Sequence, residues 1–161
     1  MRSSNQPFMN LVKLESDVDA APETRPLSTF IMTAFDRIEP AEGVSAMNSI
    51  NSTILQSLFM PSFYRTTIVS LVLVIVALSH WSEPGSVAML VGGLVYIAGM
   101  TLCTIFFNVP LNNGLDGTDP ASVAAPSIWS HYLKAWTLWN HVRTISSTAA
   151  CALYIAAIAA K

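Results

Sequence analysis

The sequence predicts an all-α integral membrane protein, folded as a helical bundle. Hydrophobic residues make up 52% of its 161 residues and charged residues only 11%, whereas about 25% are charged in a typical soluble domain. The charges leave three long uncharged windows, at residues 66–82, 84–115 and 144–160. About 17 to 25 apolar residues suffice for a helix to cross a bilayer. Runs this uniformly apolar lack the alternation of barrel strands, so we expect helices.

Residues 1–26 are predicted to form a polar, disordered tail, because they carry Lys13, several acidic residues and three prolines. No apolar region or small-residue cleavage site follows Arg2, so the segment does not resemble a signal peptide. The apolar stretch 27–35 is too short to cross a bilayer alone, and Asp36 ends it. We expect residues 27–161 to form a single membrane helical-bundle domain.

An amphipathic helix is predicted near residues 40–60. Pro40 is suited to the first helical position, and Pro61 predicts a kink or break before the next helix. Asn48 and Asn51 lie close to one face of this helix. Two amides on one face can bind either a ligand or a neighbouring helix, and the sequence favours the second role.

Membrane crossings are predicted near residues 63–80, 86–107 and 144–160. Helices in lipid pack through small residues that let their backbones approach closely. Such residues occur in the last two crossings at Gly92, Gly93, Gly99, Ala152, Ala156 and Ala160. We interpret both sets as packing surfaces without chemistry.

A polar cluster follows the middle crossing. Pro110 removes a backbone donor, and Gly114 predicts the end of the helix. Asn108 and Asn112 are four residues apart and share a face if the helix continues past Pro110. This cluster could be an ordinary cap and turn, but three clusters containing Asn at similar depth favour a shared site.

A second amphipathic helix is predicted near residues 120–143, directly before the last crossing. At about 100° per residue, one stripe of this helix carries an amide, a guanidinium and several aromatic rings. The stripe consists of Trp129, Tyr132, Trp136, Asn140 and Arg143, with Trp139 at its edge and His141 on the opposite side. Two interpretations remain open: an aromatic belt with an Arg anchor at the headgroups, or one wall of a polar pocket.

The distribution of Lys and Arg predicts an orientation. With three crossings, seven of the 8 basic residues lie on the side of the N-terminus, and only Lys161 lies opposite. The positive-inside rule then places the N-terminus in the cytoplasm and the protein in the cytoplasmic membrane. A fourth crossing before Asp36 would leave four basic residues on each side, which is a weaker signal.

Metal, redox and nucleic-acid sites are not expected. His131 and His141 are separated by about 15 Å along a helix and lie on different faces, so they cannot share one ion. His80 lies in a loop at the opposite membrane face. Cys103 and Cys151 fall in separate crossings, where reduced apolar packing is the usual role. The net charge of −2 and the absence of a basic stripe argue against nucleic-acid binding.

Five groups of residues together carry a family resemblance that covers residues 28–160. They are Ser28-Thr-Phe-Ile-Met32, Ala46-Met-Asn-Ser-Ile-Asn51, Phe107-Asn-Val-Pro-Leu-Asn112, Trp129 with Tyr132, and the stretch from Trp136 to Arg143. With these residues the sequence resembles the anthrone oxygenase-like family, a group of small bacterial and fungal membrane proteins that are mostly uncharacterised. The two most specific pieces are Asn108-Val-Pro-Leu-Asn112 and Trp139-Asn-His-Val-Arg143.

The resemblance implies a four-helix membrane bundle and, for some members, the oxygenation of an anthrone to an anthraquinone without a metal or flavin cofactor. This chain departs from the family at its first helix, where an acidic, proline-rich tail replaces the usual apolar stretch. We therefore expect the first helix to be truncated or atypical, or the true start to lie elsewhere.

Under that implied activity, Arg143 and Asn140 would donate hydrogen bonds to an enolate oxygen, and His141 is the nearest candidate base. The remaining candidates would bind the substrate: Trp136, Trp139, Asn108, Asn112, Asn48, Asn51, Trp129 and Tyr132. The predicted partners are the lipid bilayer, a hydrophobic aromatic molecule and dioxygen, with no cofactor and no metal. The alternative is a non-catalytic membrane module that binds a lipid, a quinone-like molecule or a partner membrane protein.

Overall fold

The computed structural model describes residues 27–160, and all regular structure in this range is helical. The all-α fold is therefore confirmed; the predicted disordered tail lies outside the described residues. Two segments, η1 and η2, are π-helical and continue α5 into α6. In chain order the elements are α2 (Leu27–Phe35), α3 (Pro40–Leu55), α4 (Phe59–Ser79), α5 (Ser86–Tyr96), η1 (Ile97–Leu102), η2 (Thr104–Asn108), α6 (Val109–Asp116) and α7 (Ala125–Ala159).

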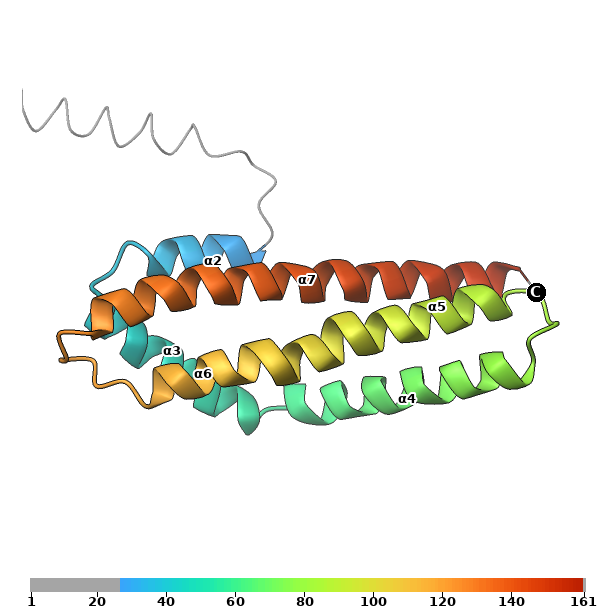
Figure 1. Cartoon of the computed structure of the whole chain (residues 1–161), viewed down its shortest axis with the longest axis horizontal. Helices are drawn as coiled ribbons and strands as arrows, with labels where there is room; N and C mark the ends of the chain where they lie inside the picture. Colours follow the sequence, from blue (N-terminus) through green and yellow to red (C-terminus); the bar gives the residue numbers. More distant parts are fainter. Residues whose placement is uncertain (1–26, 161) are drawn as a thin grey trace, which may run out of the picture.

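Three of these helices are long and apolar enough to cross a membrane: α4, the continuous helix Ser86–Asp116, and α7. They run along the long axis of the molecule, with α2 and α3 gathered at one end (Figure 1). The chain is thus a helical membrane protein. The 35 residues of α7 extend about 52 Å, whereas the hydrocarbon core of a bilayer is about 30 Å thick. Helix α7 is therefore longer than a straight crossing of the hydrocarbon core requires.

The predicted helix near 120–143 and the predicted crossing near 144–160 lie in one helix, because α7 is unbroken from Ala125 to Ala159. Helix α3 begins as its sequence indicates, with Glu39 as the N-cap and Pro40 in the first turn. The break expected at Pro61 lies instead at residues 56–58. Pro61 falls in the first turn of α4, where backbone N–H groups have no partner within the helix and a proline is tolerated.

Gly114 does not end its helix, contrary to the prediction. The helix continues to Asp116, and Gly117 is the C-cap. The turns before Pro110 are π-helical: the Val109 N–H bonds to the Thr104 carbonyl, five residues back. A proline normally clashes with the carbonyl four residues before it, and the wider π turn lies directly before that position. The helix therefore passes Pro110 without ending.

The predicted packing role of the glycines is confirmed. A Cβ atom added to Gly93 would meet the Val74 side chain of α4, and one added to Gly92 would meet the Tyr154 ring of α7. Gly99, in η1, likewise faces a side chain of α7. Helix α5 is therefore in close contact with both of its long neighbours.

The predicted alanine stripe on α7 is wrong. Ala152, Ala156 and Ala160 are exposed, and the buried alanines of this half of the helix are Ala150 and Ala157. These two are seven residues apart, which places them on one face after two turns. The face of α7 that approaches α5 is set by where the glycines of α5 allow contact, and the stripe of three alanines points away from that contact.

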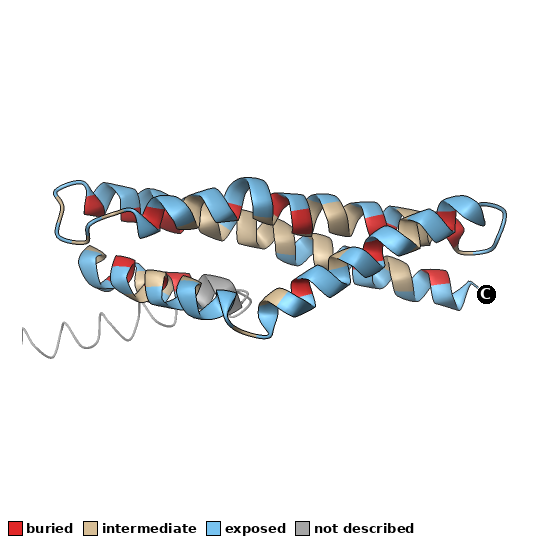
Figure 2. Ribbon diagram, turned by 90° about the horizontal axis from the view of Figure 1, so that it is seen from below, coloured by how far each residue is buried: buried red, intermediate tan, exposed pale blue. Residues whose placement is uncertain are grey.

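The hydrophobic core lies at the end where α2, α3, α6 and α7 meet. It consists of Met32, Val44, Met47, Leu115, Trp129, Tyr132 and Leu133. Along the rest of the long helices, buried positions alternate with many exposed ones (Figure 2). Exposed apolar side chains are expected where a helix faces lipid, because lipid solvates them as well as a protein core does.

Gly85 provides a test of the turn between α4 and α5. Its φ of 82° is the only positive value among the described residues, and an added Cβ would collide with the Ala157 carbonyl. We expect Gly85→Ala to lower the free energy of unfolding by about 2 kcal/mol or more. Gly114→Ala is the control, because nothing lies within 4 Å of a Cβ there, and it should raise helix stability by up to about 1 kcal/mol. Equal thermal unfolding of the two variants in detergent would contradict the described turn.

The path of the chain predicts from which side of the membrane two of its loops are accessible: the loop between α4 and α5, and the loop between α6 and α7. Because the helix Ser86–Asp116 separates them, Ser82→Cys and Asp119→Cys should react with a membrane-impermeant thiol reagent from opposite sides. Both changes are made in a chain carrying Cys103→Ser and Cys151→Ser. We expect Asp119→Cys to react from the cytoplasmic side, following the basic residues. Reaction of both cysteines from one side would refute a single crossing between them.

Candidate functional site

A cluster of amides joins α3, α6 and α7 near the end of the bundle. The Tyr132 hydroxyl donates a hydrogen bond of 2.9 Å to Asn112 Oδ1. Asn51 lies beside the same hydroxyl, and Asn48 Nδ2 donates to the Leu115 carbonyl at 3.3 Å. Four residues predicted from the sequence therefore meet here: Asn48, Asn51, Asn112 and Tyr132.

Several amide atoms in this region are buried without a hydrogen-bond partner among the described residues. Asn108 is 2% exposed, and neither its Nδ2 nor its Oδ1 has a partner. Asn48 Oδ1 also lacks a partner, whereas Asn51 Nδ2 lies beside the Tyr132 hydroxyl but outside hydrogen-bond geometry. Asn108 lies one turn before Asn112 and therefore on the same face. An unsatisfied buried polar atom costs about 1–3 kcal/mol, so this group of donors and acceptors is suited to binding a polar ligand.

Arg143 and Asn140 form a second, separate part of the predicted site. Both are half-buried on α7, and Arg143 Nε is buried without a partner among the described residues. Cys103 and Tyr96 lie close enough to Arg143 for electrostatic interaction. Arg143 is eleven residues from Tyr132, or about 16 Å along the helix. The candidate residues therefore form an elongated row along α7 and not one compact cluster.

The aromatic candidates differ in their surroundings. Trp129 and Tyr132 belong to the buried core, where their rings stack at a centroid distance of 5.7 Å. Trp136 is half-buried against that core. Trp139 is also half-buried and stacks on Phe107, with centroids 3.7 Å apart and ring planes inclined by 10°. Trp136 and Trp139 therefore lie between the amide cluster and Arg143, with part of each side chain accessible.

The histidine and cysteine side chains do not gather into one site. His141 is half-buried on α7. Cys103 is buried and its thiol donates to the Trp139 carbonyl at 3.7 Å, whereas Cys151 is exposed. Within residues 27–160, no three His, Cys, Asp or Glu side chains are placed to hold a metal ion.

Three pairs of hydroxyl groups connect the crossings, and none of them was predicted from the sequence. Thr66 and Tyr96 share a hydrogen bond of 2.6 Å, and Thr67 and Thr101 share one of 3.0 Å. In the third pair, the Tyr154 hydroxyl of α7 donates a hydrogen bond of 3.0 Å to Ser70 of α4. The signal was present, because Thr66, Thr67 and Ser70 fall near one face of an otherwise apolar crossing.

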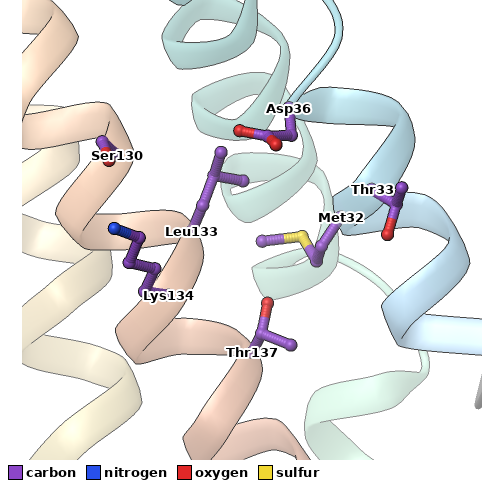
Figure 3. A pocket seen from close by; sticks show the side chains of 7 residues that line it. All are labelled: Met32, Thr33, Asp36, Ser130, Leu133, Lys134 and Thr137. Carbon is purple, nitrogen blue, oxygen red and sulfur yellow. The ribbon is translucent and has the colours of Figure 1, made fainter.

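Three cavities of the described residues lie outside the amide cluster. One, of about 260 Å³, lies along α3. The larger of the other two, about 530 Å³, is a groove between α4, α5 and α7. The remaining one, about 340 Å³, lies between α2 and α7 (Figure 3). Met32 and Leu133 extend into this last cavity, with Asp36 and Lys134 at its sides. None of the candidate residues from the sequence lines any of these cavities.

Comparison with known proteins gives one finding. The family described as anthrone oxygenase matches residues 55–153, which is more than half of the chain. The match includes Asn108, Asn112 and the row from Trp129 to Arg143, and it leaves out the two asparagines of α3. No curated protein and no solved structure matches the chain.

Two substitutions test whether the buried amides hold the fold together. Asn108→Leu removes two unpartnered polar atoms and keeps a similar shape, so the free energy of unfolding should stay the same or rise. Tyr132→Phe removes the bond to Asn112 and leaves a buried acceptor alone, so stability should fall by about 1–3 kcal/mol. Thermal unfolding in detergent measures both. A large loss of stability in Asn108→Leu would show that Asn108 serves the fold.

Proposed function

Since the chain belongs to the anthrone oxygenase family, we propose that it oxygenates an aromatic, membrane-soluble carbon acid with dioxygen. The observation that supports this proposal is the buried, unpartnered amide of Asn108, together with the unpartnered Nε of Arg143. Polar atoms that have no partner in the fold are available to a ligand. The cofactor-independent form of the reaction rests on the family resemblance.

With an anthrone as the substrate, the overall reaction converts anthrone and dioxygen into anthraquinone and water. A base first removes a proton from the methylene carbon, which gives an enolate. The carbanion carbon then bonds to dioxygen, and protonation of the outer oxygen gives a hydroperoxide. Loss of the second C–H proton forms the new C=O bond and breaks the O–O bond. The departing hydroxide takes up a proton and leaves as water.

In this proposal Arg143 and Asn140 donate hydrogen bonds to the enolate oxygen. A guanidinium carries five N–H donors in a fixed plane, and donors held in place before reaction stabilise developing negative charge. Trp136 and Trp139 flank the planar ring by stacking. The amide atoms of Asn108 bind a polar substituent at the other end of the ring system, and Asn48 and Asn51 extend this surface.

The position of the site at the end of the lipid crossing suits this chemistry. The last 16 residues of α7, 144–159, carry no charge, so Arg143 lies at the boundary of the hydrocarbon core. An apolar substrate and dioxygen can reach this depth from the lipid. Protons can be exchanged with water on the side of Arg143 that lies away from the hydrocarbon core, and His141 is the proposed base for this exchange. We propose the cytoplasmic membrane as the location, on the basis of the distribution of basic residues.

Oxygen uptake tests the proposal directly. Membranes containing the full chain should consume dioxygen when an anthrone is added. Arg143→Gln should lower kcat by about 10²- to 10³-fold, the typical effect of removing one preorganised donor. Lys134→Gln, a change at an exposed residue about two and a half turns earlier on the same helix, should leave the rate unchanged. Both variants are compared at equal amounts of folded protein.

The same experiment can favour a second function. Two bonds, from Asn48 to Leu115 and from Tyr132 to Asn112, join helices in the manner of a structural network. They support a non-catalytic module that binds a lipid, a quinone-like molecule or a partner membrane protein. Folded protein that takes up no oxygen with any anthrone would favour this module. Uptake that is unchanged in Arg143→Gln would place the reaction elsewhere.

A further inference from the structure

The groove between α4 and α7 has the size of a ligand site. Its volume of about 530 Å³ lies within the range of roughly 300–1,000 Å³ that is usual for small-molecule pockets. Each of the three helices contributes to its lining, with Thr66 from α4, Tyr96 from α5 and Ser147 from α7. Because these helices cross the membrane, the groove opens sideways toward lipid.

The groove is more polar than a surface that only contacts acyl chains. The hydroxyls of Tyr96 and Thr66 share one hydrogen bond, and those of Tyr154 and Ser70 share another. Ser70 is buried, and all four residues line the groove. A hydroxyl group can both donate and accept, so each pair can add a bond to an oxygen atom of a ligand.

The groove is also positively charged at one end. Arg65 lines it, and the described residues that line it include no Asp or Glu. Arg65 lies directly before the uncharged window of α4, which places its guanidinium near the lipid headgroups. A guanidinium binds a carboxylate through two parallel hydrogen bonds. This end of the groove is therefore suited to a ligand with an acidic group.

Ser147 and Tyr96 connect the groove to the candidate catalytic row. Both residues line the groove, and Ser147 lies one turn after Arg143 on the same face of α7. Arg143 also interacts electrostatically with Tyr96. A molecule held in the groove against Ser147 and Tyr96 is therefore near Arg143.

We propose that this groove admits the substrate from the lipid, and that the substrate is a planar, oxygenated aromatic molecule with a carboxylate or phenolate that binds to Arg65. The ring would lie against Tyr96 and Tyr154, beside Arg143. This inference rests on the proposed oxygenase function and specifies the class of its substrate.

Cys151 allows binding in the groove to be measured without catalysis. Its exposed thiol lines the groove, and in a Cys103→Ser chain it is the only cysteine, since the sequence has 2. The probe is anthraquinone-2-carboxylate, which is already oxidised. The measurement is the rate at which a membrane-permeant maleimide modifies Cys151 in vesicles. At ten times its Kd, the probe should slow this rate roughly tenfold, because only unoccupied grooves react.

Two controls separate groove binding from effects on the membrane. Ile155, one turn further along α7, is 62% exposed and does not line the groove. In a chain with Cys103→Ser and Cys151→Ser, labelling of Ile155→Cys should not be slowed by the probe. Arg65→Gln, a change at an exposed residue, should raise the Kd of the carboxylate probe by about tenfold or more and leave that of uncharged anthraquinone unchanged.

Each result has a defined meaning. Three results would overturn the groove as the acid-binding entry site. They are equal slowing at Cys151 and Ile155→Cys, no slowing at either cysteine, and protection by the carboxylate probe that does not depend on Arg65. Protection that depends on Arg65, in a protein that takes up no oxygen, would support the groove and contradict the oxygenase. Oxygen uptake by a protein whose Cys151 is not protected by the probe would support the oxygenase and contradict the groove.

Discussion

The close approach of α5 to both of its long neighbours determines the arrangement of this bundle. Lipid provides no hydrophobic force between helices, so contact depends on how closely the backbones can pack. Gly92 and Gly93 let α5 meet α7 and α4 at adjacent positions. Helix α5 lies between α4 and α7, which meet each other through the Tyr154–Ser70 hydrogen bond, and the groove is lined by all three helices. The same helix continues through η1 and η2, which brings Asn108 to α7.

The two ends of the bundle are stabilised differently. At one end, an apolar core from four helices surrounds the amide cluster. Along the crossings, hydroxyl pairs and glycine contacts replace that core. The buried amide atoms without partners occur at the end with the more extensive packing. Apolar packing there can offset the cost of leaving polar atoms unsatisfied, which is common where a protein binds a ligand.

The sequence predicted most of the fold because membrane crossings follow from composition alone. The uncharged windows located all three long helices, and Pro40 located the start of α3. The prediction that the helix ends at Gly114 was wrong because a π turn, which has no clear sequence signal, lets the helix pass Pro110. The prediction that the alanine stripe packs against a neighbouring helix was wrong because periodicity shows which residues share a face but not which face is buried. For the site, spacing indicated the amides of α3 and α6 that meet near Tyr132. It could not show that Asn140 and Arg143 lie further along α7, or that a groove lies beyond them.

The two π-helical segments also fix the rotational phase of the helix that carries them. A π turn spans one residue more than an α turn, so each segment shifts the following residues by about 100° relative to an uninterrupted α-helix. Asn108 and Asn112 therefore point toward α7 only because of the residues accommodated before them. Loss of a single residue from this stretch would leave the composition of the crossing almost unchanged and turn both amides toward a different neighbour. In this helix, the number of residues between Tyr96 and Asn108 is as much a part of the site as their identity.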